Sequence, residues 1–413
     1  MKIAFINNMN NYFFAFTRYL RDAGVDAHVF VLKKTEDHFK PEADTFSDVS
    51  TLDYVHEMPY TVNYLFKLNP MVPSIKSYFS GFDIILACGP LIAFLAQEGI
   101  RVDVAIPYGS DFYSLPFEQF SIKKPISSLV KSFIAKKQRE GLRMSRVIII
   151  DETCDLYRLA LKEIGVKAYN VGIPMLYSRE FDEIEDASPQ WSFLNSNDFV
   201  LFNHTRQWWK TKVDNELEDF DIYGGAKRND KLIRAFATFV KCTKFQSPIL
   251  VLFEYGADVL ASKELITELK IDAFVKWMPV MHRKNILLGL KKATFASNAF
   301  RENEEGIGGV CYEALSVGTC LLNNISTIKE DKGHFFQDSP MIHVLSEEDI
   351  LNVFIDYEND TLKYKKISKK SKSWYDKKVG VQLINQYIRL FTALNHNKKL
   401  THLDSEIRDI LIA

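Results

Sequence analysis

The stretch EEGIGGVCYEALSVGT, residues 304–319, is a glycine-rich segment that runs directly into an apolar, helix-forming sequence. Three of its glycines lie close together: Gly306, Gly308 and Gly309. Glycines let a backbone approach a ligand closely, and the free N–H groups at the start of the following helix favour phosphate. Glu305 precedes that helix and Glu313 lies one turn inside it. The stretch is therefore either a ligand-binding loop or an ordinary turn followed by a solvated helix.

Two classes of ligand use a glycine loop of this kind. A dinucleotide loop reads G-x-G-x-x-G at the first strand-to-helix turn of its domain, with an acidic residue about twenty residues further on. Here the third glycine is missing and several apolar strands precede the loop in its half of the chain, so hydride transfer is disfavoured. The carboxylates favour a sugar nucleotide: Glu313 can accept two hydrogen bonds from a ribose diol, and Glu305 can reach hydroxyls beyond the phosphate.

Apolar strands alternate with helices along most of the chain. In the first half the predicted strands are KIAFIN (2–7), DAHVFVL (26–32), DIILACG (83–89), DVAIPYG (103–109), RVIII (146–150) and KAYNVG (167–172). In the second half they are DFVLFNHT (198–205), SPILVLFEYG (247–256), DAFVKWMPV (272–280), TFASNAF (294–300) and TCLLNN (319–324). Helices are expected between them, including 125–144, 229–243, 258–270, 281–292 and a helix near 308–317. This alternation predicts parallel sheets covered on both faces, which bind ligands at the carboxyl ends of their strands.

The alternation is interrupted once, at residues 176–196, where acidic and turn-forming residues indicate a linker. Two domains are therefore expected, one over residues 1–175 and one over residues 190–378. The C-terminal helices, about 380–413, carry an amphipathic pattern and are expected to pack back on the first domain.

The overall composition is that of a globular protein, with 413 residues, 47% of them hydrophobic, and a net charge of -1. The chain as a whole is therefore not a polyanion binder. Its five cysteines show no metal-ligand or disulfide spacing, which fits a reducing compartment: Cys88, Cys154, Cys242, Cys311 and Cys320. The start lacks the apolar run of a signal peptide, and the longest apolar tract, 84–96, falls short of the ~20 residues that a span requires. A cytoplasmic location is expected.

The opening stretch resembles the signature E-G-F-G-x-x-x-x-E-A-x-x-x-G of retaining glycosyltransferases of family four. The matching positions are Glu305, Gly306, Gly308, Glu313, Ala314 and Gly318, and Ile307 replaces the usual Phe. The segments KRNDKLIRAF (227–236) and SWYDKKVGVQLINQYIRLF (373–391) resemble two further elements of that family. The resemblance implies an α/β architecture of the GT-B type: two Rossmann-like parallel-sheet domains that face a central cleft.

The same resemblance implies two cations that bind the diphosphate of the donor. They are Arg206, in NHTRQWW (203–209), and Lys227, just before a predicted helix. Two cations there would neutralise the charge that grows on the leaving group as the glycosidic bond breaks. The spacing between them is longer than usual, so two further lysines are alternatives: Lys210 and Lys212. The wall of the donor site is expected to include Gly306, Ile307, Gly308, Gly309, Tyr255 and Met278.

On the acceptor side, IPYGSDF (106–112) resembles an H-G-S-D element of the family. Gly109 and Asp111 keep the pattern, and Tyr108 stands where His is common. Asp111 is a candidate catalytic residue that would hydrogen-bond the acceptor or the sugar, although a Gly-Ser-Asp turn is also an ordinary helix cap. Asn8, in NNMNN (7–11), could line the same side, but asparagine's tolerance of turns explains the loop equally well.

Metal and nucleic-acid chemistry are not indicated. The D-x-D match at 219–221 lies in an acidic segment and reads as a solvated loop, so no metal or cofactor is expected. Residues 123–146 carry eight basic residues against Glu140 alone, a pattern typical of a basic amphipathic helix on anionic lipid or of a solvated face. Residues 363–378, with eight lysines against Asp376, read as a solvated face. No nucleic-acid-binding module accompanies either charge run.

The sequence thus predicts a retaining glycosyltransferase that moves a sugar from a nucleotide-diphosphate sugar to a glycan or lipid-linked acceptor. Glu313 would hold the ribose and Glu305 the donor sugar. Two alternatives remain open: a sugar-nucleotide epimerase of the same fold, and a degenerate glycosyltransferase that acts as a binding partner.

Overall fold

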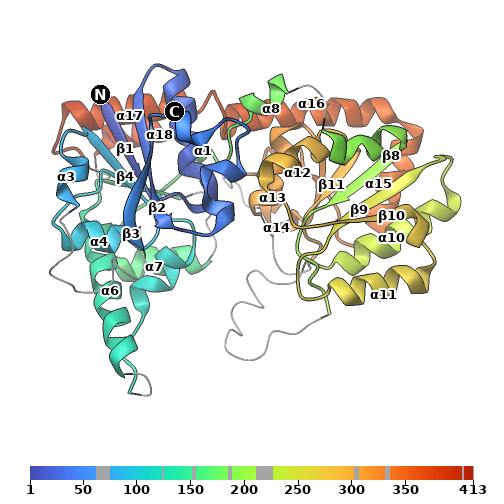
Figure 1. Ribbon diagram of the computed structural model, residues 1–413, viewed down its shortest axis with the longest axis horizontal. Coiled ribbons are helices and arrows are strands. Elements are labelled where there is room, and N and C mark those ends of the chain that lie inside the picture. Colours follow the sequence, from blue (N-terminus) through green and yellow to red (C-terminus); the bar gives the residue numbers. More distant parts are fainter. Residues whose placement is uncertain are drawn as a thin grey trace. The chain divides into compact units, whose positions relative to one another are not determined.

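The chain folds into two compact units, Met1–Tyr177 with Lys377–Ala413, and Ser178–Asp376 (Figure 1). The computed structural model describes residues 1–61, 75–122, 125–150, 155–184, 188–210, 227–301, 307–330, 335–401 and 404–412. Each unit contains one sheet, and every paired strand in both sheets is parallel. The predicted organisation as two parallel-sheet α/β domains is confirmed.

The sheet of the first unit has the strand order β3-β2-β1-β4-β5-β6-β7. Its strands are β1 (Lys2–Ile6), β2 (Asp26–Lys34), β3 (Val55–Thr61), β4 (Ile84–Ala87), β5 (Val104–Ala105), β6 (Val147–Ile150) and β7 (Tyr169–Asn170). The edge strand β3 was not expected from the sequence, because its segment VHEMPYT lacks a clean alternation and contains a proline. An edge strand tolerates proline, since one row of its backbone N–H groups has no partner strand.

Successive residues of β1 face opposite layers of helices, as expected for a strand buried on both sides. Ile3 and Phe5 belong to one apolar core, and Ala4 and Ile6 to the other. The first core includes α1 (Tyr12–Asp22) and α17 (Ile384–His396), and the second includes α4 (Leu91–Gln97), α6 (Pro125–Met144) and α7 (Asp155–Ile164). The remaining helices of this unit are α3 (Lys76–Phe79), α5 (Ser110–Tyr113) and α18 (Ser405–Ile412).

The sheet of the second unit has the strand order β10-β9-β8-β11-β12-β13. Its strands are β8 (Phe199–Asn203), β9 (Pro248–Phe253), β10 (Val275–Met278), β11 (Phe295–Ser297), β12 (Cys320–Asn323) and β13 (Ile342–His343). Its helices are α8 (Arg179–Glu183), α10 (Asn229–Cys242), α11 (Val259–Leu269), α12 (Arg283–Leu290), α13 (Gly309–Ser316), α14 (Ser326–Glu330), α15 (Glu347–Asn359) and α16 (Thr361–Lys378). The helices predicted in this half are therefore present, whereas the two-residue β13 was missed.

The second portion of the segment 176–196 is packed on the second unit. Trp191, in the 3₁₀ segment Pro189–Ser196, is fully buried and donates from Nε1 to the carbonyl of Asn285 at 2.8 Å. A Cβ added to Gly289 would lie 2.7 Å from the ring of Trp191 and 2.8 Å from the ring of Phe202. The acidic and turn-forming residues around Trp191 gave no indication in the sequence that this side chain is buried against the second unit.

Replacing Gly289 with Ala should destabilise the second unit, because the added methyl group would collide with two buried aromatic rings. Overpacking of this kind costs about 1–3 kcal/mol. The midpoint of urea unfolding, followed by tryptophan fluorescence, measures the loss. Leu260→Ala, at a position 74% exposed on α11, should leave the midpoint unchanged. A Gly289→Ala midpoint equal to that of the unmodified chain would show that Trp191 is not held as described.

Candidate functional site

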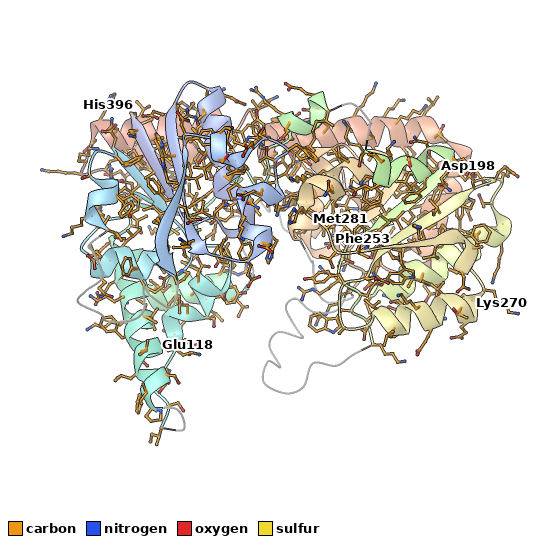
Figure 2. The ribbon with its side chains drawn as sticks, in the orientation of Figure 1. Glu118, Asp198, Phe253, Lys270, Met281 and His396 are labelled. Carbon is orange, nitrogen blue, oxygen red and sulfur yellow. The ribbon has the colours of Figure 1, made fainter. Side chains whose placement is uncertain are left out.

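The sheet of the second unit has a switch point between β8 and β11. The chain runs from β8 to β9 and β10 on one side, and from β11 to β12 and β13 on the other. Open parallel sheets bind ligands outside the carboxyl ends of their strands at such a point. Figure 2 shows Phe253 and Met281 at this edge of the sheet and Asp198 at the opposite edge. A ligand site is therefore expected at the segments that follow β8 and β11.

A buried polar network fixes the segment that follows β8. The Oδ1 atom of Asn203 accepts hydrogen bonds from Thr205 Oγ1, Gln207 Nε2 and Asn229 Nδ2, at 3.2, 3.2 and 3.1 Å. Its Nδ2 atom donates to Ser297 Oγ at 2.9 Å. All five residues are buried, so the network ties the end of β8 to the start of α10 and to β11.

The predicted phosphate ligands Arg206 and Lys227 lie on neighbouring segments of this edge. The backbone N–H of Lys227 donates to the carbonyl of Trp208 at 2.7 Å, so residues 211–226, outside the described ranges, leave and rejoin the described chain at nearby points. The ammonium group of Lys227 donates to Asn298 Oδ1 at 3.2 Å. The guanidinium of Arg206 lies 5.2 Å from the ring centre of Trp208. Both cations therefore stand at the carboxyl ends of β8 and β11.

Of the two alternative lysines, Lys210 is exposed, and its backbone N–H donates to Asp258 Oδ2 at 2.6 Å. Lys212 lies outside the described residues, as do Glu305 and Gly306 of the opening stretch and the D-x-D match at 219–221. Within the described ranges, no three His, Cys, Asp or Glu side chains are grouped so that they could hold a metal ion.

Glu313, on α13, is 7% exposed and lies between two nitrogen donors. Arg283 Nε donates to its Oε1 at 2.9 Å, and His204 Nε2 lies 2.7 Å from its Oε2. Burial raises the pKa of Glu313, but the hydrogen bonds and charges of His204 and Arg283 outweigh it, so the pKa falls below its usual range. Because an ionised carboxylate only accepts hydrogen bonds, Nε2 is the protonated nitrogen of His204.

His204 and Arg283 were not singled out from the sequence. The only available signal was that His204 directly follows a buried strand, within NHTRQWW. Together they connect α13 to the loop after β8 and to α12, and they fix the rotamer of Glu313. A carboxylate has about four acceptor positions, and hydrogen bonds within the described part of the chain occupy two of them.

The described part of the opening stretch places its glycines at the start of α13. Ile307 and Gly308 are half-buried, Gly309 is exposed, and Gly308 is the residue immediately before the helix. Among the described residues, no atom lies within 4 Å of where a Cβ on Gly308 would be. A Cβ on Gly309 would lie 3.6 Å from Glu313 Oε1, so the carboxylate reaches back toward the first residue of its own helix.

Tyr255 follows β9, and Met278 is the last residue of the neighbouring strand β10. Tyr255 is 52% exposed, and its carbonyl accepts from the N–H of Gln207 at 2.6 Å. Met278 is buried, and its carbonyl accepts from the N–H of Glu254 at 2.9 Å. Gly256 has a φ of +113°, and a Cβ there would lie 2.4 Å from the carbonyl oxygen of Gln207. The loops after β8, β9 and β10 are therefore held in close contact.

In the first unit, Asp111 is 3% exposed and each of its oxygens accepts from backbone amides. Oδ1 accepts from the N–H groups of Tyr108 and Gly109, at 3.1 and 3.0 Å, and Oδ2 accepts from that of Gly89 at 2.8 Å. Burial raises the pKa of Asp111 to about 6, although these amides act in the opposite direction. Gln138 of α6 donates to the carbonyl of Asp111 at 2.9 Å. Asp111 thus joins the loops that follow β4 and β5.

Asn8 is also committed to internal bonds. Its Nδ2 donates to Asn11 Oδ1 at 2.6 Å and to the carbonyl of Phe39 at 2.8 Å, and its Oδ1 accepts from the N–H of Phe14 at 3.0 Å. Three asparagines of the loop have positive φ angles, which supports the turn explanation: Asn7, Asn10 and Asn11. Tyr108 is half-buried beside Gly89, with its hydroxyl 3.4 Å from where a Cβ of that glycine would be. The candidate residues thus form two groups, one in each unit.

No protein-family model matches the sequence, and no curated protein matches it. Among solved structures, Anabaena HepE in complex with UDP-glucose is similar over 95% of this chain and 99% of its own, with a TM-score of 0.55 and 15% identity. Sucrose-phosphate synthase of Thermosynechococcus elongatus is similar over 95% of this chain and 100% of its own, with a TM-score of 0.52 and 12% identity. A Listeria monocytogenes protein assigned as a UDP-N-acetylglucosamine 2-epimerase covers 96% of both chains, with a TM-score of 0.50 and 11% identity. These similarities show that the chain has the GT-B fold.

Replacing Glu313 with Gln should destabilise the second unit, because the neutral amide removes the charge that pairs with Arg283 and turns an NH₂ toward one of the two nitrogen donors. Leaving a buried polar group without a suitable partner costs about 1–3 kcal/mol. The lowered pKa of Glu313 means that its contribution is present above the ordinary carboxyl pKa and is lost as the pH falls through the folded value. The stability difference between the two chains should therefore shrink on acidification, as measured by urea unfolding at several pH values. Glu264→Gln, at an exposed position on α11, is the matched control.

Asp111→Asn should show the opposite pH dependence. Its raised pKa means that the folded state holds the proton more tightly, so its contribution to stability falls as the pH rises between about 4 and 6. At neutral pH the variant should still lose about 1–3 kcal/mol, because the new amide NH₂ faces N–H donors. Thermal unfolding across this pH range tests both statements, and a difference independent of pH would contradict the first.

Proposed function

We propose that this chain is a retaining glycosyltransferase of the family-four type, which transfers a sugar from a nucleotide-diphosphate sugar to a glycan or lipid-linked acceptor. The observation that carries the proposal is the buried, ionised Glu313, held by His204 and Arg283 at the switch point of a parallel sheet. Arg206 and Lys227 lie at the same edge. The GT-B fold of the chain, and the solved complexes of HepE with UDP and UDP-glucose, support a nucleotide sugar as the donor.

The donor would occupy the carboxyl edge of the sheet in the second unit. The two unused acceptor positions of Glu313 receive the ribose hydroxyls, and Arg206 and Lys227 bind the diphosphate. A phosphate of the donor approaches the backbone at Gly308, at the start of α13. Glu305 takes the hydroxyls of the donor sugar.

In the proposed reaction the bond between the anomeric carbon and the diphosphate oxygen breaks, and a hydroxyl oxygen of the acceptor bonds to the same face of that carbon. The proton of the acceptor hydroxyl passes to the departing diphosphate, whose negative charge Arg206 and Lys227 stabilise. No protein nucleophile and no metal is assigned to this step. The specificity for the base involves Tyr255, just after β9, and Met278, at the end of β10.

The acceptor is assigned to the first unit, at the carboxyl ends of β4 and β5. Two amide contacts of Asp111 shape the 108–111 loop and the third ties that loop to Gly89, so Asp111 acts by positioning Tyr108 and Gly109. Asn8 supports the adjoining loop after β1. A lipid-linked acceptor is included in the proposal, with the chain in the cytoplasm and membrane contact through residues 123–146. None of the helices in the described ranges combines the length and hydrophobicity needed to cross a bilayer.

A thermal-shift screen with UDP-, GDP-, ADP- and CMP-sugars tests the donor site. A ligand that binds only the folded state adds about 2.7 kcal/mol at a hundred times its dissociation constant, so a true donor should raise the midpoint by several degrees. Arg206→Ala and Lys227→Ala should abolish the shift, and Lys210→Ala should retain it. The absence of a shift with every sugar nucleotide would overturn the proposal.

Product analysis with the identified donor tests the reaction. The anomeric configuration of the product, measured by NMR, should equal that of the donor, and Glu305→Ala should lose transfer activity. A second candidate, a sugar-nucleotide epimerase, is favoured by the similarity to the Listeria protein. An epimerase would convert the donor with no acceptor present, so incubation with donor alone separates the two activities.

A further inference from the structure

The start of α6 and the segment before it carry large apolar side chains that are exposed. They are Phe120 (54% exposed), Ile122 (87%), Ile126 (82%) and Leu129 (64%), named here the apolar tip. In Figure 1 this end of α6 extends away from the sheet of the first unit. An isolated exposed apolar residue is ordinary, but a group of four within ten residues indicates a surface that contacts something apolar.

The apolar tip rests on a defined base. Ile126 and Leu129 are three residues apart on α6, which places them on one face of the helix, and Ile122 lies in the segment that precedes it. Ser128, between them, is buried, and its hydroxyl lies 2.9 Å from the carbonyl of Ser121 and 3.2 Å from that of Pro125. These bonds connect Ser121, which precedes the helix, to the first turn of α6.

The remainder of α6 is packed in the ordinary way. Ile134, Ala135 and Leu142 are buried, and a Cβ on Gly141 would lie 2.7 Å from the carbonyl oxygen of Ile92 on α4. The helix therefore has one half that belongs to the core and one end that does not.

The basic residues of this helix and of the segment just after it divide in the same way. Arg146, which follows the helix, is buried, with Asp103 at 2.8 Å, and Arg143 donates to the carbonyl of Ile164 at 2.8 Å. Arg139 donates to the carbonyl of Pro116, and Lys137 pairs with Glu140 at 2.6 Å on the helix itself. These four cations already have partners within the first unit, so the helix does not present a continuous basic face.

The cations nearest the apolar tip remain at the surface. Lys131 and Lys136 are exposed, and Lys123 and Lys124, outside the described residues, follow Ile122 directly in the sequence. Glu118, labelled beside this helix in Figure 2, is the only acidic residue between Asp111 and Glu140, and it lies 3.4 Å from Lys131. The surroundings of the apolar tip are therefore positively charged.

We propose that the apolar tip inserts into an anionic lipid surface, with Phe120, Ile122, Ile126 and Leu129 below the headgroups and Lys131 and Lys136 against lipid phosphates. Apolar side chains flanked by lysines match such a surface in both hydrophobicity and charge. Two copies of the apolar tip placed face to face would bring like charges together, which disfavours self-association. The inference rests on the proposed function, because membrane contact would serve to reach a lipid-linked acceptor. Lipid binding is measured separately from donor binding.

Co-sedimentation of the full chain with vesicles tests the inference. The chain should bind vesicles of phosphatidylcholine mixed with phosphatidylglycerol, and bind pure phosphatidylcholine at least about tenfold more weakly, since each surface lysine adds about 1 kcal/mol of attraction to anionic lipid. Ile126→Gln with Leu129→Gln should weaken binding to the mixed vesicles about tenfold or more, because both side chains lose their apolar contact. Leu260→Gln, equally exposed on α11, is the matched control and should bind as the unmodified chain does. Ile126→Trp should keep the binding, since Trp favours the membrane interface.

Three results would overturn the inference: no binding of the unmodified chain to mixed vesicles, equal binding by the double Gln variant, or a dimer in solution that the double Gln variant converts to a monomer. The last result would assign the apolar tip to a second copy. The thermal shift with the donor should be the same in the double Gln variant and the unmodified chain. If the unmodified chain shows the donor shift but does not bind vesicles, the membrane inference fails and the proposed function stands. If it binds vesicles but shows no donor shift, the proposed function fails and the membrane inference stands.

Discussion

The hydrogen-bonded carboxylate of Glu313 is the interaction on which the arrangement of the second unit's site depends. It joins α13 to the loop after β8 through His204 and to α12 through Arg283. Burying a charge is costly unless it is paired and hydrogen-bonded, and here two donors meet that condition. The same bonds orient the carboxylate and keep it ionised. Any ligand that needs an acceptor at this edge therefore meets one whose position and charge are already fixed.

The first unit uses a buried carboxyl in a chemically different way. Asp111 joins the loops after β4 and β5, but its partners are three backbone amides and no cation. Amide dipoles compensate less of the cost of burial than a full charge does, which explains why the pKa of Asp111 rises while that of Glu313 falls. The two groups both fix loops at strand ends. Glu313 therefore stays ionised below the ordinary carboxyl pKa, whereas Asp111 takes up a proton near pH 6.

The parts of the fold that could be predicted are those marked by patterns among neighbouring residues in the sequence. Buried strands and amphipathic helices are periodic along the chain, so the two parallel sheets and the helices of the second unit could be derived from it. The strand β3 was missed because proline interrupts its pattern, and Trp191 was missed because its neighbours are polar. His204 and Glu313 are 109 residues apart in the sequence, and Arg283 and Glu313 are 30 apart. No local sequence pattern therefore marks their contact. The sequence marked Glu313 as a site residue but contained nothing that named its partners.

The basic residues in and around α6 also show that a sequence does not reveal which partners its side chains have in the fold. The sequence counts eight cations in 123–146, but a count does not distinguish a cation that solvates a surface from one that satisfies a buried carbonyl. Arg139, Arg143 and Arg146 have long side chains with several donors. They donate hydrogen bonds to carbonyls, and Arg146 also pairs with Asp103, inside the first unit. What is left at the surface is the end of the helix, where lysines accompany exposed apolar side chains. Lipid attraction there depends on both parts, because the lysines bring the chain to an anionic surface and the apolar side chains hold it there.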